Sequence, residues 1–195
     1  MQSQINFKDD THQYFVGGIE YPSVTRVIST AGLYGPAAAY FNEESRNRGS
    51  LVHEKIESYL SGELDEETLD PVIVPYLDAW KKFQAEAHYV SDSCEERLAS
   101  DVYHFAGTID HIGHLNGHFS IIDVKTGVPV PATGIQLAGY EILLSARGAR
   151  RFALHLQDDG KYRLIEYKDR NDRPLFISLL ALWNWKRNAG IKIIT

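Results

Sequence analysis

Two β-prone segments joined by Asn116-Gly117 place the strongest constraint on what this chain can fold into. An Asn-Gly dipeptide between two apolar runs is a strong short-range signal for a β-hairpin, because both residues tolerate the positive φ of a type I′ turn. The first segment reads Gly107-Thr108-Ile109-Asp110, and the second reads Ile121-Ile122-Asp123-Val124-Lys125-Thr126-Gly127. We therefore expect two neighbouring strands, each with an acidic residue inside an apolar run.

The polar side chains of these two strands should meet in one site. Successive side chains of a strand point to opposite faces, so Asp123 and Lys125 share one face while Ile122 and Val124 lie on the other. The neighbouring strand can bring Asp110 beside them. Two carboxylates and one ammonium group on adjacent strands indicate a divalent-metal site with a positively charged side chain beside it.

Length and composition limit the class of protein. The 195 residues most simply form one domain over residues 1–195. No apolar run approaches the ~20 residues of a membrane span, and residues 1–6 lack the features of a signal peptide, so a cytoplasmic location is expected. Cys94 is the only cysteine, which excludes an internal disulfide and a cysteine-ligated zinc or iron–sulfur site. The net charge of −6 argues against coating nucleic acid through bulk charge, but it leaves room for a local basic groove.

The remaining pattern predicts a mixed α/β (α+β) fold. A short hairpin around Gly17-Gly18 and a short helix capped near Ser23 come first, and residues 33–39 are expected to be irregular or to begin a helix. Helical periodicity and stop signals then predict helices over 49–60, 71–88, 132–146 and 172–188. Alternating apolar residues predict strands over 95–100, 103–112, 118–124, 151–157 and 161–168. This order predicts a central mixed β-sheet flanked by helices.

Five short motifs follow one another between residues 49 and 140. They are Gly49-x-x-x-His53, Glu95, Gly107-Thr108-Ile109-Asp110, Asp123-Val124-Lys125-Thr126-Gly127 and Gln136-x-x-x-Tyr140. In this order they resemble the motifs of the PD-(D/E)XK nuclease superfamily, and specifically its RecB-like exonuclease group with a restriction-endonuclease-like core. Ile109 stands where the family name has proline. Each motif alone is weak, so the resemblance rests on their joint order and spacing.

The resemblance implies a role for the central residues. Asp110, Asp123, the backbone carbonyl of Val124 and His53 would bind one or two Mg²⁺ or Mn²⁺ ions. Magnesium prefers oxygen ligands, whereas a histidine nitrogen suits manganese better. Lys125 would orient the attacking water or stabilise the transition state as a point charge, and it completes a catalytic triad with Asp110 and Asp123.

The resemblance to the nuclease motifs also bears on four other residues. Gln136 and Tyr140 would bind the nucleic-acid backbone or the waters of the metal site. Glu95 would be the acidic residue that precedes the core. Glu96 competes for that role, because adjacent strand residues face opposite ways and only one of the two can face the site. The family pattern favours Glu95.

By resemblance, the chain would be a metal-dependent DNA exonuclease that hydrolyses phosphodiester bonds from linear ends. Stand-alone domains of this size are similar to those of bacteriophages and prophages, where they act in DNA recombination or repair beside a single-strand annealing protein. RecB-like nucleases of the CRISPR-adaptation and helicase-nuclease kinds often carry four cysteines around an iron–sulfur cluster, and with one cysteine this chain is expected to lack that cluster. A monomer with an open cleft and a ring that encircles DNA both fit the sequence.

Two alternatives share the same fold. One is a structure-directed endonuclease, and the other is a non-catalytic module that binds DNA ends or a partner. The intact set of Asp110, Asp123, Lys125, Gln136 and Tyr140 argues against a decayed site. A small-molecule enzyme on an unrelated α/β fold would need a phosphate-binding glycine loop or a nucleophile elbow, and the sequence has neither.

Overall fold

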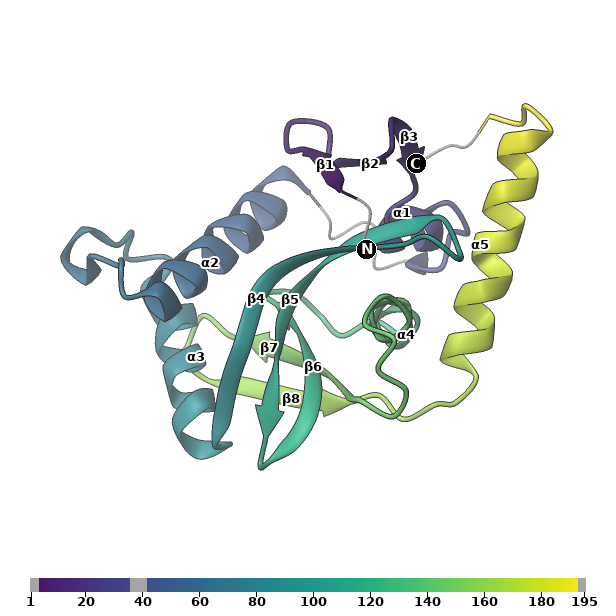
Figure 1. Cartoon of the computed structure of the whole chain (residues 1–195). Helices are drawn as coiled ribbons and strands as arrows, with labels where there is room; N and C mark the ends of the chain where they lie inside the picture. Colours follow the sequence, from purple (N-terminus) through teal and green to yellow (C-terminus); the bar gives the residue numbers. More distant parts are fainter. Residues whose placement is uncertain (1–3, 36–41, 193–195) are drawn as a thin grey trace.

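A computed structural model describes residues 4–35 and 42–192, and its centre is a five-stranded mixed sheet (Figure 1). The strand order is β4-β5-β6-β7-β8, and neighbours are antiparallel except for the parallel pair β6 and β7. The strands are β4 (Tyr89–Ser100), β5 (Phe105–Leu115), β6 (His118–Lys125), β7 (Arg150–Leu156) and β8 (Tyr162–Glu166). The expected mixed α/β fold, with a central mixed sheet flanked by helices, is confirmed.

The Asn116-Gly117 hairpin is also confirmed. Leu115 pairs with His118, so the loop has two residues, and these adopt φ values of 50° and 77°, as a type I′ turn requires. The chain leaves β6 through α4 (Ala132–Leu143) and returns as β7, parallel to β6. A parallel pair needs such a crossover.

Helices cover both faces of the sheet (Figure 1). Helices α1 (Val24–Ser29), α4 and α5 (Asp172–Asn188) pack with Ile121 in one hydrophobic cluster. Helices α2 (Glu43–Ser61) and α3 (Val74–Glu86) pack with Ile122 in a second cluster. Adjacent residues of β6 thus enter opposite clusters, as alternation in a strand predicts. Among the helices of the described residues, none combines the length and apolar character needed to cross a membrane.

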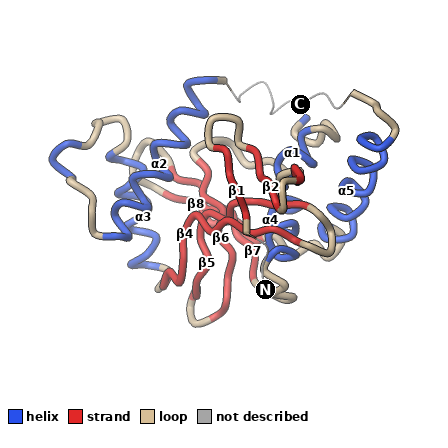
Figure 2. Tube along the Cα trace, turned by 45° about the horizontal axis from the view of Figure 1, so that its top comes forward, coloured by secondary structure: helices blue, strands red, loops and turns tan. Residues whose placement is uncertain are grey.

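A second, three-stranded sheet lies at the N-terminal end. Its strands are β1 (Ile5–Lys8), β2 (Gln13–Val16) and β3 (Ile19–Tyr21), paired in that order. The expected hairpin around Gly17-Gly18 joins β2 to β3, and β1 adds a third strand. Tyr14, Val16 and Tyr21 pack on Ala106 of β5, and the small sheet lies between α2 and α1 (Figure 2).

Several element boundaries differ from the expected ones. Helix α2 begins at Glu43 rather than at residue 49, because the Asn42 side chain caps it by accepting a hydrogen bond from the Ser45 amide at 2.8 Å. Strand β4 begins at Tyr89, six residues before the expected start, and a short 3₁₀ helix, η2 (Glu66–Thr68), precedes α3. The expectation for residues 33–39 falls largely outside the described residues.

Candidate active site

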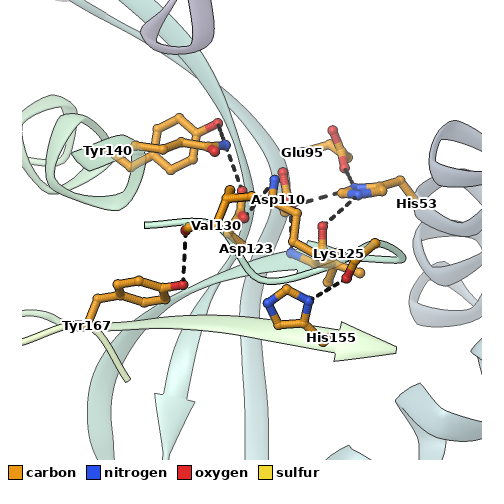
Figure 3. A network of polar contacts seen from close by, with 12 residues as sticks. His53, Glu95, Asp110, Asp123, Lys125, Val130, Tyr140, His155 and Tyr167 are labelled. Carbon is orange, nitrogen blue, oxygen red and sulfur yellow. Dashed lines mark hydrogen bonds and ion pairs between the residues drawn. The ribbon is translucent and has the colours of Figure 1, made fainter. Parts of the chain in front are cut away.

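The two predicted strand carboxylates and the lysine come together at the centre of the sheet (Figure 3). Asp110 of β5 and Asp123 of β6 have side chains that are almost completely buried. Lys125 Nζ lies 2.7 Å from Asp123 Oδ2, and Asp110 Oδ2 accepts a hydrogen bond from the Val124 amide at 2.8 Å. The geometry expected from strand alternation and the hairpin is therefore present.

Helix α2 brings His53 into this cluster. In Figure 3, His53 and Tyr140 lie on opposite sides of the site. Nδ1 of His53 lies 3.1 Å from Glu95 Oε1 and 3.8 Å from Asp110 Oδ2. Nε2 lies 3.2 Å from the Val124 carbonyl oxygen. Both ring nitrogens thus face acceptors, which is the pattern of an imidazolium that donates from each nitrogen.

The structure places Glu95, not Glu96, against His53. Glu95 has a left-handed backbone, with φ of 49°, and lies between the paired positions Cys94–His111 and Glu96–Ile109. Asp110 occupies the matching position of β5. A left-handed residue interrupts regular strand geometry and re-aims its side chain. This local irregularity directs the Glu95 carboxylate toward the site.

Three ligand-type side chains form a compact group. Donor atoms of His53, Glu95 and Asp110 all lie within 4.8 Å of one another. Two carboxylates and one imidazole suit a divalent cation such as magnesium or manganese. The expected ligands were His53, Asp110, Asp123 and the Val124 carbonyl oxygen, with Glu95 as a further site residue. In the structure, Asp123 contacts Lys125 and a side-chain amide of α4.

That amide belongs to Gln136 of α4, which contacts both Asp123 and Tyr140. Gln136 Nε2 donates to Asp123 Oδ1 at 2.8 Å and to Tyr140 Oη at 2.9 Å. Gln136 and Tyr140 are both only 4% exposed. Sequence analysis expects these two residues to bind the nucleic-acid backbone or the waters of the metal site, and that role stays a prediction. In the structure, Gln136 bonds to the Asp123 carboxylate and to Tyr140 and so can fix the position of that carboxylate.

The glycine of the second motif has a packing role. A Cβ atom at Gly107 would come within 3.2 Å of side-chain atoms of Tyr140, Leu143 and Val24. Gly107 therefore allows α4 to approach β5 closely enough for Gln136 to reach Asp123.

Burial and the mutual charges set the protonation of the site. Desolvation alone would lower the pKa of His53, but the charges of Asp110 and Glu95 outweigh it and raise the pKa to about 9. Desolvation raises the pKa of Asp123 to about 6, although Lys125 opposes the rise. Desolvation also raises the pKa of Asp110. Desolvation would lower the pKa of Lys125, but Asp123 and Asp110 raise it. A metal ion bound at His53 would displace a proton from the ring.

Sequence analysis did not identify His155, which supports the loop after β6. His155 of β7 pairs in register with Lys125, and its Nδ1 donates to the Gly127 carbonyl at 2.8 Å (Figure 3). The contact spans 28 residues and depends on the parallel register of β6 and β7. No short sequence motif indicates that His155 and Gly127 are in contact.

The chain shares its fold with a solved structure of similar size. The crystal structure of a candidate exonuclease from Eubacterium rectale aligns with a TM-score of 0.58 and 15% identity, covering 88% of this chain and 83% of that chain. An alkaline exonuclease from Laribacter hongkongensis, LHK-Exo, aligns with a TM-score of 0.39 and 15% identity over 87% and 93% of the two chains. Because the second score is low, the fold assignment rests on the first structure. No family model and no curated protein matches the sequence.

Proposed function

We propose that this protein is a metal-dependent nuclease that hydrolyses phosphodiester bonds and shortens DNA from free ends. The observation that carries the proposal is the group of His53, Glu95 and Asp110 beside the buried pair Asp123 and Lys125. Metal ligands and a fixed ammonium group within one cluster are the components that phosphodiester hydrolysis needs. The order of the family motifs along the chain adds to this support.

The candidate ligands are Asp110, Asp123, His53 and the Val124 carbonyl, and Glu95 joins them because it shares the compact group. A bound Mg²⁺ or Mn²⁺ would lower the pKa of a water and neutralise charge on the phosphate oxygens. His53 binds such an ion only after it releases a ring proton, which its contacts with Glu95 and Asp110 oppose.

Lys125 supplies the fixed positive charge. Its ammonium group contacts Asp123 at 2.7 Å, and its raised pKa keeps it protonated at neutral pH. A lysine in this position stabilises negative charge that develops on a phosphate oxygen. Gln136 and Tyr140 are positioning residues in this scheme, since Gln136 donates to the Asp123 carboxylate and Tyr140 contacts Gln136.

The biological setting that we propose comes from the resemblance to the RecB-like group. It is DNA recombination or repair of the phage type, with a single-strand annealing protein as the partner that receives the processed strand. Pull-down of a candidate annealing protein with the purified chain tests this setting separately from the chemistry.

The decisive experiment compares two forms of one DNA. An end-labelled linear duplex and the same sequence as a covalently closed circle are incubated with magnesium or manganese. We expect progressive shortening of the linear form and survival of the circle. Lys125→Ala should abolish cleavage, whereas the matched variant Lys82→Ala, which removes an exposed lysine of α3, should cleave normally.

The outcomes separate the alternatives. Equal cutting of circles and linear DNA would replace the exonuclease by a structure-directed endonuclease. Binding of DNA ends without cleavage under either metal would favour a non-catalytic module. Cleavage that persists in Lys125→Ala would show that the Asp-x-Lys motif is not catalytic.

A further inference from the structure

One loop connects the two elements that carry Lys125 and Gln136. Residues 126–131 follow Lys125 at the end of β6 and lead into α4, whose Gln136 side chain donates to the Asp123 carboxylate. These six residues belong to neither a helix nor a strand. Their conformation is therefore set by contacts with other parts of the chain, and those contacts influence both the lysine and the amide of the candidate site.

Three side chains within the described part of the chain hydrogen-bond to the main chain of this loop. The shortest contact is that of His155 in β7, whose Nδ1 lies 2.8 Å from the Gly127 carbonyl oxygen (Figure 3). The other two contacts, from Arg48 and Tyr167, are each 3.4 Å long. Hydrogen bonds with a nitrogen donor are normally about 2.7–3.2 Å long. His155 therefore provides the strongest side-chain contact to the loop.

His155 lies beside Lys125 in the sheet. The two residues pair in register across the parallel strands β7 and β6, and paired residues of neighbouring strands have side chains on the same face. His155 is only 3% exposed. Burial lowers the pKa of its imidazole, so the ring is neutral at pH 7 and carries one hydrogen. Because a carbonyl oxygen only accepts hydrogen bonds, that hydrogen is on Nδ1.

The other ring nitrogen of His155 does not contact the loop. Nε2 is buried and has no hydrogen-bond partner among residues 4–35 and 42–192. The polar influence of His155 on the loop therefore comes from Nδ1 alone. This difference between the two nitrogens allows the effect of the hydrogen bond to be separated from the effect of filling space with a ring.

We propose that His155 is a positioning residue for Lys125. Its Nδ1 donor fixes the Gly127 carbonyl, two residues after the lysine, and so holds the end of β6 in the orientation in which Lys125 Nζ lies 2.7 Å from Asp123 Oδ2. The proposal rests on the proposed nuclease function for the role of Lys125. It adds a residue of β7 that acts through the loop rather than on the substrate.

Two substitutions separate the ring nitrogens. The side-chain amide nitrogen of asparagine is as many bonds from Cβ as Nδ1, and that of glutamine is as many bonds from Cβ as Nε2. His155→Asn should therefore keep the bond to Gly127, and His155→Gln should lose it. Because a displacement of about 1 Å can cost ~100-fold in rate, we expect His155→Gln to lower kcat on linear DNA ~10–100-fold. KM should change by less than about twofold, and His155→Asn should retain kcat within about threefold.

A second measurement reports on Lys125 without any cleavage. Lysines are acetylated with acetic anhydride, and the rate at each position is read by peptide mass spectrometry. The contact with Asp123 protects the Lys125 amine. We expect acetylation of Lys125 to be ~5-fold faster in His155→Gln, a fraction of what complete loss of a hydrogen bond between charged groups allows, and parent-like in His155→Asn. Lys82, an exposed lysine of α3, is the internal reference and should react equally in every variant.

Tyr167→Phe is the matched control at the other end of the loop. It removes the hydroxyl that contacts the Val130 carbonyl, but that carbonyl also accepts a hydrogen bond from the Thr133 amide at 3.1 Å. The kcat value and the acetylation of Lys125 should therefore stay within about twofold of the parent. Urea unfolding of each variant confirms that it is folded under the assay conditions.

The positioning role and the nuclease function can fail separately. Parent-like kcat and Lys125 acetylation in His155→Gln, with cleavage by the parent, would overturn the positioning role alone. Equal losses in His155→Asn and His155→Gln would also overturn it, because the ring would then act by filling space. Faster Lys125 acetylation in His155→Gln alone, with a parent that cleaves no DNA under either metal, would refute the nuclease alone.

Discussion

The amide of Gln136 provides a quantitative test of how α4 controls the charge of Asp123. Both side chains are buried, and the amide donates to the carboxylate at 2.8 Å. Gln136→Leu keeps a side chain of similar size but removes the donor. A hydrogen bond to a charged group contributes about 1.5–3 kcal/mol. Since one pKa unit corresponds to about 1.4 kcal/mol, the pKa of Asp123 should rise from about 6 by roughly one to two units.

The sign of the pH dependence follows from the raised pKa. Folding favours the protonated form of Asp123, so this contribution to stability is fully present below the ordinary pKa of 3.8 and is lost as pH rises through the folded pKa. In the parent that loss is nearly complete by about pH 7, whereas in Gln136→Leu it continues to about pH 9. The difference in unfolding free energy between parent and variant should therefore widen by about 2 kcal/mol between pH ~5 and pH ~8.5.

Urea unfolding at both pH values, in a chelator, measures this difference. Tyr140→Phe is the control, because it removes the hydroxyl that also accepts from Gln136 but leaves the amide–carboxylate contact in place. Its cost, about 1 kcal/mol, should be the same at both pH values. A Gln136→Leu cost that does not change with pH would refute the idea that the amide acts on the ionised carboxylate.

Three further predictions concern neighbouring residues. Glu95→Gln should lower manganese affinity about 10-fold in calorimetric titration, while Glu96→Gln leaves it unchanged; equal effects would remove Glu95 from the ligand set. Gly113→Ala should destabilise the fold by about 3 kcal/mol, because an added Cβ would collide with the Val90 carbonyl oxygen, and a near-parental urea midpoint would contradict this packing. Burial lowers the pKa of His111 to about 3, so protonation in the unfolded state removes stability as pH falls below 6.5; His111→Phe should abolish about 2 kcal/mol of the loss between pH ~6.5 and pH ~4.5, and an unchanged pH profile would show that His111 is not its source.

The parts of the site that the sequence predicts are those set by local geometry. Asn116-Gly117 determines the hairpin, and strand alternation then places Asp123 and Lys125 on one face. These relations need only neighbouring residues. They are also the relations that the structure reproduces most closely.

The parts that the sequence does not predict depend on contacts between distant elements. Helical spacing shows that Gln136 and Tyr140 share a face, but nearly every residue of α4 is buried, so the pattern does not indicate which face meets the sheet. The alignment of Glu95 depends on a left-handed backbone that an ordinary strand pattern does not indicate. Helical periodicity does not indicate the start of α2 at Glu43, because the first turns of this helix are polar and carry no apolar stripe.

The division of the core between two faces of the sheet has a consequence for how activity is lost. Asp123, Lys125 and Gln136 belong to one continuous β6–α4 segment, whereas His53 is carried by α2, whose buried residues are Val52 and Ile56. A 19-residue helix held by so few buried side chains opens at a lower free energy than the sheet. Opening of α2 would remove the imidazole while the aspartate, lysine and glutamine keep their arrangement. Helix α2 is then the part of the candidate site that opens first. The proposed nuclease activity should therefore be lost on heating before the sheet melts, and it should return on cooling.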